Sequence, residues 1–235
     1  MMYKRVLLKL SGESIGSKPS NSGISKKSLK EIAEEIKLAI NKNKVQLSIV
    51  IGSGNILRGK EMNFIERTTA DYMGMLSTVI NSLALQSALE NQGLKTRVMS
   101  AIDMPKIAES YIRRRAIRHL EKGRIIIFAA GTGNPYFTTD TTAALRAIEI
   151  NADILIKATQ VDGVYSDDPK KNFKAKKFKE ITFMEAIKRQ LKVMDTTAFS
   201  LCMENKLPVV VFNLYKKGNL LKVLEGKSEV GTVIK

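Results

Sequence analysis

The chain has 235 residues, 44% of them hydrophobic and 26% charged, and no apolar run approaches the roughly 20 residues that cross a bilayer, which indicates one sizeable core and no membrane span. The single cysteine excludes an intramolecular disulfide and a cysteine-rich zinc site, and the single histidine, His119, excludes a histidine-based metal cluster. The formal net charge of +16 favours an anionic partner, but few aromatic residues interleave with the scattered basic clusters, so specific nucleic-acid binding is not expected.

The first apolar segment, residues 5–10, is too short for a signal peptide and contains Lys9, so we interpret it as the first strand of a cytoplasmic protein. Similar runs of valine, isoleucine and leucine are typical of strands in a parallel sheet that is covered on both faces. They predict strands at 46–52, 95–100, 124–131, 153–159 and 208–214.

Helical spacing of apolar residues predicts a helix between the first two strands, with Ser28 and Glu31 as its capping box. A longer helix is predicted around 69–91, with Leu76 and Ile80 among the residues that face the core. Further helices fit 139–150, 183–190 and 196–205. The alternation of strands and helices predicts an α/β fold, a three-layer αβα sandwich with a mainly parallel central sheet, in a single domain over residues 1–235.

Four glycine-containing loops each follow a predicted strand, at 9–14, 51–59, 129–145 and 157–169. Any one of them is an ordinary turn. Because the carboxyl ends of parallel strands meet at one edge of a sheet, the four loops are expected to converge on a common crevice that binds a ligand.

The second loop contains a near match to a nucleotide-binding P-loop, GNILRGKE at residues 54–61. Glu61 stands where the P-loop needs serine or threonine, and Gly59 and Lys60 come too late after the predicted strand. We interpret the match as coincidental. What remains is an amide-rich turn at Gly52–Gly54 followed by Arg58, both of which can serve phosphate oxygens.

Two other loops carry polar side chains that suit phosphate chemistry. Thr138, Thr139 and Asp140 precede a predicted helix, where they either complete an anion site or merely cap the helix at Thr139 or Asp140. Lys9 ends a buried strand, where it either reaches solvent or holds an ammonium group over transferring phosphates. Phosphoryl transfer suits a chain with so little histidine, because it depends mostly on positioning and charge neutralisation.

Seven segments of the chain resemble, in order, the bacterial uridylate kinase family: YKRVLLKLSGES, IVIGSGNILRG, ADYMGMLSTVINSLAL, AAGTGNPYFTTDTTAALRAIEI, KATQVDGVYSDDP, LKVMDTTAFSL and LPVVVFN. The resemblance runs from about residue 3 to 234 and implies the amino-acid-kinase fold, with an acceptor half over roughly 1–150 and an ATP half over roughly 151–235. It implies ATP-dependent phosphorylation of UMP to UDP in pyrimidine nucleotide biosynthesis. Mg²⁺ is expected to arrive with ATP, with no fixed metal site on the protein.

The resemblance also assigns site residues. Lys9 would stabilise the transferred group, Arg58 would clamp phosphate oxygens and Asp140 would organise the reacting groups. ATP would contact Lys9, Leu10, Ser11, Gly12, Ser53, Arg58, Thr159, Tyr165 and Asp168. UMP would contact Gly52, Asp71, Thr132, Gly133, Asn134, Pro135, Tyr136, Phe137, Thr138 and Thr139, with Gly52 and Ser53 giving amides to phosphates. Asp71 would bind the ribose, although by its local sequence it could equally cap its helix, and Asp195 would be structural.

The family is typically a homohexamer that UTP inhibits and, in some members, GTP activates. Gln86 and Ser87 stand where we expect the family's arginine and acid, so we predict weak or absent GTP activation. The basic run 113–119 lies in the expected subunit-contact and effector region, and we interpret it as a solvated helix face. Two alternatives remain: a kinase of the same fold that phosphorylates a small carboxylate such as an amino acid or carbamate, and a non-catalytic nucleotide sensor or nucleic-acid-associated regulator.

Overall fold

The structure is a computed structural model, and it describes residues 3–17, 19–57, 64–167, 172–191 and 193–235. Its strands are β1 Arg5–Leu10, β2 Gln46–Ile51, β3 Thr96–Ser100, β4 Glu109–Ser110, β5 Ile125–Ala129, β6 Ile154–Thr159, β7 Glu180–Ile181, β8 Val209–Asn213 and β9 Gly231–Ile234. They form one sheet in the order β4-β3-β5-β2-β1-β6-β8-β9-β7. Every neighbouring pair is parallel except β8 and β9.

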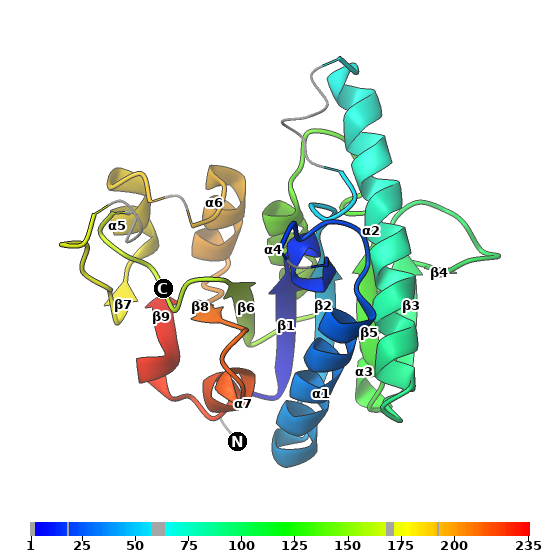
Figure 1. The fold of residues 1–235 in the computed structure, drawn as a ribbon, viewed down its shortest axis with the longest axis horizontal. Helices are drawn as coiled ribbons and strands as arrows, with labels where there is room; N and C mark the ends of the chain where they lie inside the picture. The colour runs from blue at the N-terminus through cyan, green and yellow to red at the C-terminus, as the bar shows by residue number, and fades with distance from the viewer. Residues whose placement is uncertain (1–2, 18, 58–63, 168–171, 192) are drawn as a thin grey trace.

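Helices cover both faces of this sheet (Figure 1). They are α1 Lys26–Asn43, α2 Arg67–Glu90, α3 Arg113–Glu121, α4 Thr139–Glu149, α5 Phe183–Lys188, α6 Thr196–Glu204 and α7 Asn219–Leu224, with short 3₁₀ turns η1 Gly12–Ile15 and η3 Ser228–Val230. Residues of α1, α2 and α7 form one hydrophobic core with Val6, Leu8 and Leu10 of β1. Those of α3, α4, α5 and α6 form a second core with Leu7 of β1. This alternation along a central strand confirms the predicted sandwich of three layers.

Each of the six predicted strands is found, and no strand end differs from its prediction by more than two residues. The strands that were not predicted are β4 and β7, which have two residues each, and β9, which pairs antiparallel at the far side of the sheet. The basic run 113–119 lies in α3, which buries Ala116 and Leu120 and exposes Arg113, Arg114 and Arg115, as interpreted from the sequence.

The predicted capping box of α1 is wrong. The helix begins earlier, at Lys26, because the side chain of Ser25 accepts a hydrogen bond from the backbone amide of Ser28 at 3.2 Å. Ser28 is therefore inside the helix, where its hydroxyl donates to the Gly16 carbonyl at 3.0 Å and ties α1 to the loop that follows η1.

The predicted orientation of α2 is also wrong at two residues. Leu76 and Ile80 are 52% and 49% exposed, whereas the buried residues of α2 include Ser77, Thr78 and Asn81. Apolar periodicity misplaced the helix because its inward face carries polar side chains that hydrogen-bond to loops, as described below. Within the described residues, no helix is both long and apolar enough to span a membrane.

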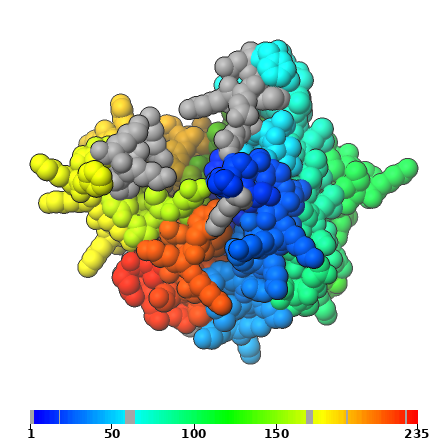
Figure 2. Space-filling model, viewed as in Figure 1, coloured from blue at the N-terminus to red at the C-terminus, as the bar shows by residue number. Residues whose placement is uncertain are grey.

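The carboxyl ends of β1, β2, β5 and β6 lie at one edge of the sheet, the upper edge in Figure 1. Figure 2 shows the segment after β1, in blue, at the middle of this edge, between the start of α2 in cyan and residues 172–190 in yellow. The loops that follow these strands therefore meet in one region, as the sequence predicts.

Candidate active site

Two lysines and one aspartate form a buried ionic cluster at this edge. Lys9 and Lys157 occupy matching positions on the adjacent strands β1 and β6. The Lys9 ammonium lies 3.0 Å from Asp140 Oδ1, and the Lys157 ammonium lies 2.5 Å from Asp140 Oδ2. The side chains of Lys9, Lys157 and Asp140 are only 13%, 12% and 16% exposed, respectively. Sequence reasoning found Lys9 and Asp140 but missed Lys157.

Oδ1 of Asp140 is buried without an aligned hydrogen-bond donor among the described residues, although the Lys9 ammonium is close to it. We take the 3.0 Å distance as an ion pair, since charge attraction does not require donor alignment. The carboxylate therefore retains lone pairs for a further donor, and each ammonium retains N–H groups for an anion.

The cluster shifts the pKa values of its members. Burial alone would raise the pKa of Asp140, but the charges of Lys9 and Lys157 outweigh burial and lower this pKa below its ordinary value. Burial lowers the pKa of Lys157, an effect that the Asp140 carboxylate opposes and the Lys9 charge reinforces. Lys157 also donates a hydrogen bond to the Val193 carbonyl. The cluster therefore holds two positive charges and one negative charge, and its excess positive charge can bind an anion.

The loops after β1 and β2 approach each other closely beside this cluster. A Cβ atom on Gly12 would lie 2.6 Å from the Gly52 carbonyl oxygen and 2.7 Å from the Gly54 nitrogen, so only glycine fits there. The resemblance predicts that the Gly52 amide binds a phosphate. This amide instead donates to the Leu10 carbonyl at 3.0 Å. The amides of Gly12, Ser53 and Gly54 donate to no residue that the structure describes, so these N–H groups remain available to phosphate oxygens.

Helix α2 holds the two loops of the acceptor side through two rows of residues, each row repeating after two turns. In one row, Gly74 lies against Ser53 and the Asn81 amide donates to the Gly52 carbonyl at 2.8 Å. In the other row, Asp71 accepts from the Tyr136 amide at 2.7 Å and Thr78 accepts from the Ala130 amide at 2.9 Å. These contacts explain why the inward face of α2 is polar.

Asp71 is not the cap of α2. The Glu66 carboxylate accepts from the amides of Thr68 and Thr69, both at 3.1 Å. Interaction with the Thr68 side chain is the largest cause of its pKa shift, and together with these amides it lowers the pKa of Glu66 to about 2. Asp71 lies more than a turn further along, where it holds Tyr136 in a left-handed conformation with φ of 71°. Its carboxylate is thus directed at the loop after β5.

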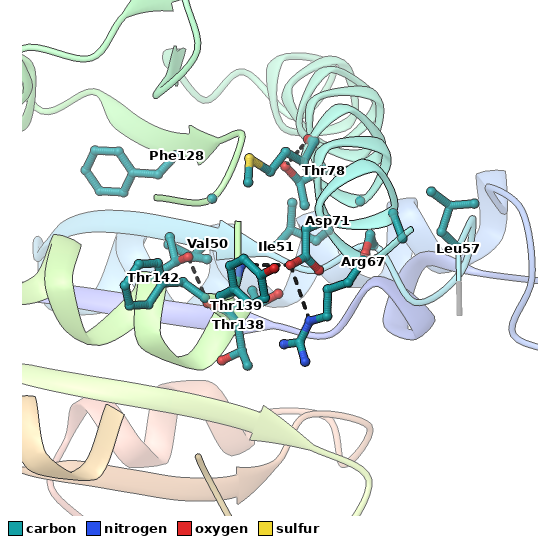
Figure 3. Close-up of a pocket in the computed structure, with 17 residues that line it drawn as sticks. Val50, Ile51, Leu57, Arg67, Asp71, Thr78, Phe128, Thr138, Thr139 and Thr142 are labelled. Carbon is teal, nitrogen blue, oxygen red and sulfur yellow. Dashed lines mark hydrogen bonds and ion pairs between the residues drawn. The ribbon is translucent and has the colours of Figure 1, made fainter. Parts of the chain in front are cut away.

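A cavity of about 380 Å³ lies between α2, the β2 loop and the start of α4. Figure 3 shows Asp71 and Arg67 from α2 pointing into the same space as Thr138 and Thr139. Of the predicted acceptor loop, Tyr136, Phe137, Thr138 and Thr139 line the cavity, whereas Thr132, Gly133, Asn134 and Pro135 do not. Thr132 instead stabilises its own turn, since its hydroxyl accepts from the Asn134 amide at 3.2 Å.

The start of α4 is capped by Thr138, and not by Thr139 or Asp140. Its hydroxyl oxygen accepts from the amides of Asp140 at 3.1 Å and Thr141 at 3.2 Å, so Thr138 is the cap and Asp140 is left to bind the lysines. The Thr138 hydroxyl also donates to Asp195, which caps α6 and accepts from the Thr141 hydroxyl at 2.9 Å. Asp195 thus joins α4 to α6.

Two further cavities lie on the other side of the ionic cluster. One of about 280 Å³ is lined by Lys9, Ser11, Lys157 and Tyr215 among others. The other, of about 680 Å³, is lined by Tyr165 among others and shares Lys157, Thr159 and Gln160 with the first. The Tyr165 hydroxyl donates to Asp162 at 2.7 Å, which fixes the ring against the β6 loop. Of Leu10, a predicted ATP contact, only the backbone could reach a ligand, because its side chain is fully buried in the core.

Two of the predicted site residues, Arg58 and Asp168, lie outside the described residues, as does the second half of the near P-loop, from Arg58 to Glu61. Among the residues that are described, no group of three or more acidic, histidine or cysteine side chains could hold a metal ion. Asp140 is a single carboxylate between two ammonium groups, so the described part of the cluster does not fit a metal ion held by the protein alone.

Sequence reasoning missed Arg67 and Tyr215 as well as Lys157. Lys157 had a readable signal, since both "RVLLKL" and "DILIKAT" carry one lysine near the carboxyl end of an apolar strand. Arg67 lies 3.6 Å from Asp71 and 5.1 Å over the Tyr136 ring, and nothing in its local sequence marks those contacts. Tyr215 follows β8, which is parallel to β6, and a ligand-binding loop could have been expected there.

Comparisons with known proteins agree with this geometry. The profile described as the amino acid kinase family matches residues 4–213. UMP kinase from Bacillus anthracis is similar at 40% identity and a TM-score of 0.96, with 100% of this chain and 97% of that chain covered. UMP kinase from Ureaplasma parvum is similar at 41% identity and a TM-score of 0.93, with both chains covered completely, each at 100%.

Uridylate kinase from Archaeoglobus fulgidus is similar at 30% identity and a TM-score of 0.72, with 98% of this chain and 99% of that chain covered. These structural neighbours are phosphotransferases, and their similarity extends over both halves of the sheet. Together with the profile match, it establishes that this chain belongs to the amino acid kinase family.

Proposed function

We propose that this chain transfers the terminal phosphoryl group of ATP to UMP and so forms UDP. The observation that carries the proposal is the Lys9–Asp140–Lys157 cluster between two sets of cavities. Thr139, next to Asp140, lines the cavity of about 380 Å³, and both lysines line the cavity of about 280 Å³. The similarity to UMP kinases over the full chain supports UMP as the acceptor.

In this proposal, ATP occupies the cavities beside β6, with its adenosine near Thr159 and Tyr165 and its phosphates near the lysines. UMP occupies the cavity of about 380 Å³, where Asp71 binds its ribose and Thr138 and Thr139 contact the base or phosphate. Arg58 is assigned to the phosphates by resemblance alone. The two substrates then meet at the cluster. UMP lies mainly against the acceptor half, residues 1–150, and ATP mainly against the donor half, residues 151–235, of one domain.

Phosphoryl transfer requires a UMP phosphate oxygen to bond to the terminal phosphorus of ATP while the bond to the ADP oxygen breaks. Lys9 and Lys157 would neutralise the charge that builds on the transferring group, and the Gly12, Ser53 and Gly54 amides would bind non-bridging oxygens. Asp140 would hold both lysines in place and so orient their ammonium groups toward the reacting phosphates. Mg²⁺ would enter bound to the ATP phosphates and add to the charge neutralisation there.

An acceptor panel tests the substrate assignment. Release of ADP is measured with ATP and Mg²⁺ and with UMP, CMP, dTMP or aspartate as the acceptor. Strong preference for UMP is expected. Activity with aspartate alone would keep the fold but overturn the substrate, and no activity with any acceptor would favour a nucleotide sensor. With UMP as its acceptor, the chain would be a cytoplasmic enzyme of pyrimidine nucleotide biosynthesis.

We also propose that the chain forms a homohexamer, as the resemblance implies. Tyr72, Leu76 and Ile80 form an exposed apolar stripe along α2, with one residue per helical turn, and this stripe supports self-association. Light scattering coupled to size exclusion should give a mass six times that of one chain, and Leu76→Glu should lower it. A monomeric mass for the unmodified protein would contradict the proposal.

Regulation by nucleotides follows the same resemblance. We expect inhibition by UTP, and weak or absent activation by GTP, because Gln86 stands in place of arginine and donates to Glu90 at 3.0 Å on the same helix. A titration of activity with GTP that showed stimulation of several fold would overturn the second expectation, and full activity at saturating UTP would overturn the first.

A further inference from the structure

Two buried asparagines join the loops of the candidate site. Asn55 lies in the β2 loop and is 5% exposed, and Asn81 lies in the middle of α2 and is fully buried. Each side-chain amide donates to the oxygen of the other, at 2.7 Å from Asn81 to Asn55 and at 3.0 Å in the opposite direction. Neither residue was selected by sequence reasoning.

The second N–H of each amide leaves the pair and binds a loop carbonyl. Asn81 donates to the Gly52 carbonyl at 2.8 Å, and Asn55 donates to the Gly23 carbonyl at 2.7 Å. All four N–H groups of the pair are therefore satisfied, and each side-chain oxygen accepts one of them. A buried polar network that is fully satisfied favours one arrangement over its alternatives.

The orientation of both amides is fixed by chemistry. The carbonyls of Gly52 and Gly23 can only accept, so rotating either amide by half a turn would place two oxygens against each other and two N–H groups against each other. Aspartate in either position would likewise turn a donor into an acceptor. Only a pair of side chains with one donor and one acceptor face each can close this network.

The pair also sets the position of the donor loop. A Cβ atom on Gly12 would lie 2.5 Å from Asn55 Oδ1, so the backbone of η1 rests directly on the Asn55 side chain. The Gly23 amide donates to the Asn55 carbonyl at 2.7 Å, which ties the segment before α1 to the same residue. Movement of Asn55 would therefore move the Gly12 and Gly52–Gly54 amides relative to each other.

We propose that Asn55 and Asn81 are positioning residues for phosphoryl transfer, which act by fixing the donor loop at Gly12 against the acceptor loop at Gly52–Gly54. The inference rests on the proposed function, since the two loops are assigned to the two phosphates there. Neither asparagine lines the cavities described above, so the pair acts through the loops and not by contact with a nucleotide.

The test uses the full-length protein with Asn81→Asp, which keeps the shape of the side chain but turns the donor toward Gly52 into an acceptor. Because a displacement of about 1 Å can cost a factor of roughly 100 in rate, kcat for UDP formation should fall about 10- to 100-fold. The KM values for ATP and UMP should stay within about threefold, since the groups that bind each nucleotide remain. Asn81→Ser gives a milder change that tests the same point if Asn81→Asp does not fold.

Two controls separate positioning from general destabilisation. Ser82→Ala removes a fully buried hydroxyl of the same helix that donates only within α2, to the Thr78 carbonyl at 2.7 Å. Asn205→Asp makes the same chemical change at the exposed end of α6. Both controls should keep kcat within about twofold. A folded Asn81→Asp or Asn81→Ser protein with unchanged kcat would overturn the proposal.

A second readout needs no substrate. Hydrogen exchange of peptides from 11–16, 21–25 and 52–57 should accelerate together in Asn55→Ala and Asn81→Ala, and no further in the double variant, because the pair acts as one unit. Faster exchange confined to α2, or additive effects of the two changes, would overturn the proposal. Absence of UDP formation by the unmodified protein would instead overturn the proposed function, while the exchange measurement would still decide on the pair.

Discussion

Replacing Asp140 by asparagine should cost both stability and activity. The substitution keeps the shape of the side chain but removes the carboxylate that lies 3.0 Å from the Lys9 ammonium and 2.5 Å from the Lys157 ammonium. Two like charges then remain beside each other in a site that is largely shielded from water. The variant therefore loses an attraction and gains an uncompensated repulsion.

The expected loss can be set from the burial of the cluster. Removing one member of a buried ion pair costs about 3–5 kcal/mol, and we take the lower end because the three side chains keep 12–16% of their surface exposed. For a chain of this size, a loss of about 3 kcal/mol should lower the Tm by roughly 6–12 °C. Glu185→Gln is the matched control, because its 2.6 Å pair with Arg189 is half exposed and contributes at most about 1 kcal/mol.

The assays are urea unfolding and thermal unfolding of the full chain at pH 7, with and without MgATP. Phosphates can replace the missing carboxylate between the lysines, so at the same MgATP concentration the Tm of Asp140→Asn should rise by more than that of the unmodified protein. A free energy of unfolding within about 1 kcal/mol of the unmodified protein would refute the reasoning, because the carboxylate would then not be the group that balances the lysines.

The free energy of unfolding that Asp140→Asn loses should depend on pH in a defined direction. Since the pKa of Asp140 is lower in the folded protein than its ordinary 3.8, its stabilisation is fully present above that value and is lost as the pH falls through the folded pKa. The difference between the unmodified protein and Asp140→Asn should therefore narrow only in strong acid. In the variant, the lowered pKa of Lys157 should also make stability recover as the pH rises, because the lysine can then lose its proton.

Two substitutions and one labelling experiment test other parts of the site and the core. Lys9→Ala should reduce kcat by at least about 100-fold with UMP affinity nearly unchanged, because its charge is needed most in the transition state; near-normal turnover in steady-state kinetics would contradict this. Asp71→Ala should weaken UMP binding by at least about tenfold in calorimetry and leave ATP binding largely intact, whereas equal weakening of both would indicate a collapsed acceptor side. Cys202 should resist iodoacetamide at pH 8 until the protein unfolds, because burial raises its pKa to about 12, and rapid labelling of the folded protein would contradict that burial.

The fold was predictable to the extent that it depends on hydrophobic runs. Strands β1, β2, β5, β6 and β8 are nearly continuous in valine, isoleucine and leucine, and a short apolar run of this kind between two loops is typical of a strand buried on both faces. Strands β4 and β7 have two residues each, which is too short for a periodic pattern. Their pairing depends on neighbours in the folded structure, so the sequence does not reveal them.

The orientation of α2 could not be predicted from apolar spacing. Its inward face uses Asp71, Thr78 and Asn81 to satisfy loop amides and carbonyls, so the polar side of the helix is the buried side there. A periodicity argument assumes that the core is apolar, which fails wherever a helix serves to hold loops. Leu76 and Ile80 were placed on the wrong side for this reason.

The candidate site was predictable where the loop and the strand end both carry a signal. Lys9 and Asp140 each lie next to a glycine-rich or hydroxyl-rich segment, and the register of β1 with β6 brings Lys157 to them. Asn55 and Asn81 could not be found, because a buried asparagine in a loop or helix has no local feature that distinguishes it from an exposed one. Only their meeting in space gives them a role.

Transfer of labelled phosphate in a single turnover shows whether the Lys9–Asp140–Lys157 cluster moves a phosphoryl group from ATP to UMP. ATP labelled at its terminal phosphate is mixed with excess enzyme, UMP and Mg²⁺, and the label is followed in the unmodified protein and in Lys157→Ala. The account predicts that the label appears in UDP, and that Lys157→Ala slows its appearance at least about 100-fold while both nucleotides still bind. Label released only as inorganic phosphate, or a Lys157→Ala protein as fast as the unmodified one, would contradict it.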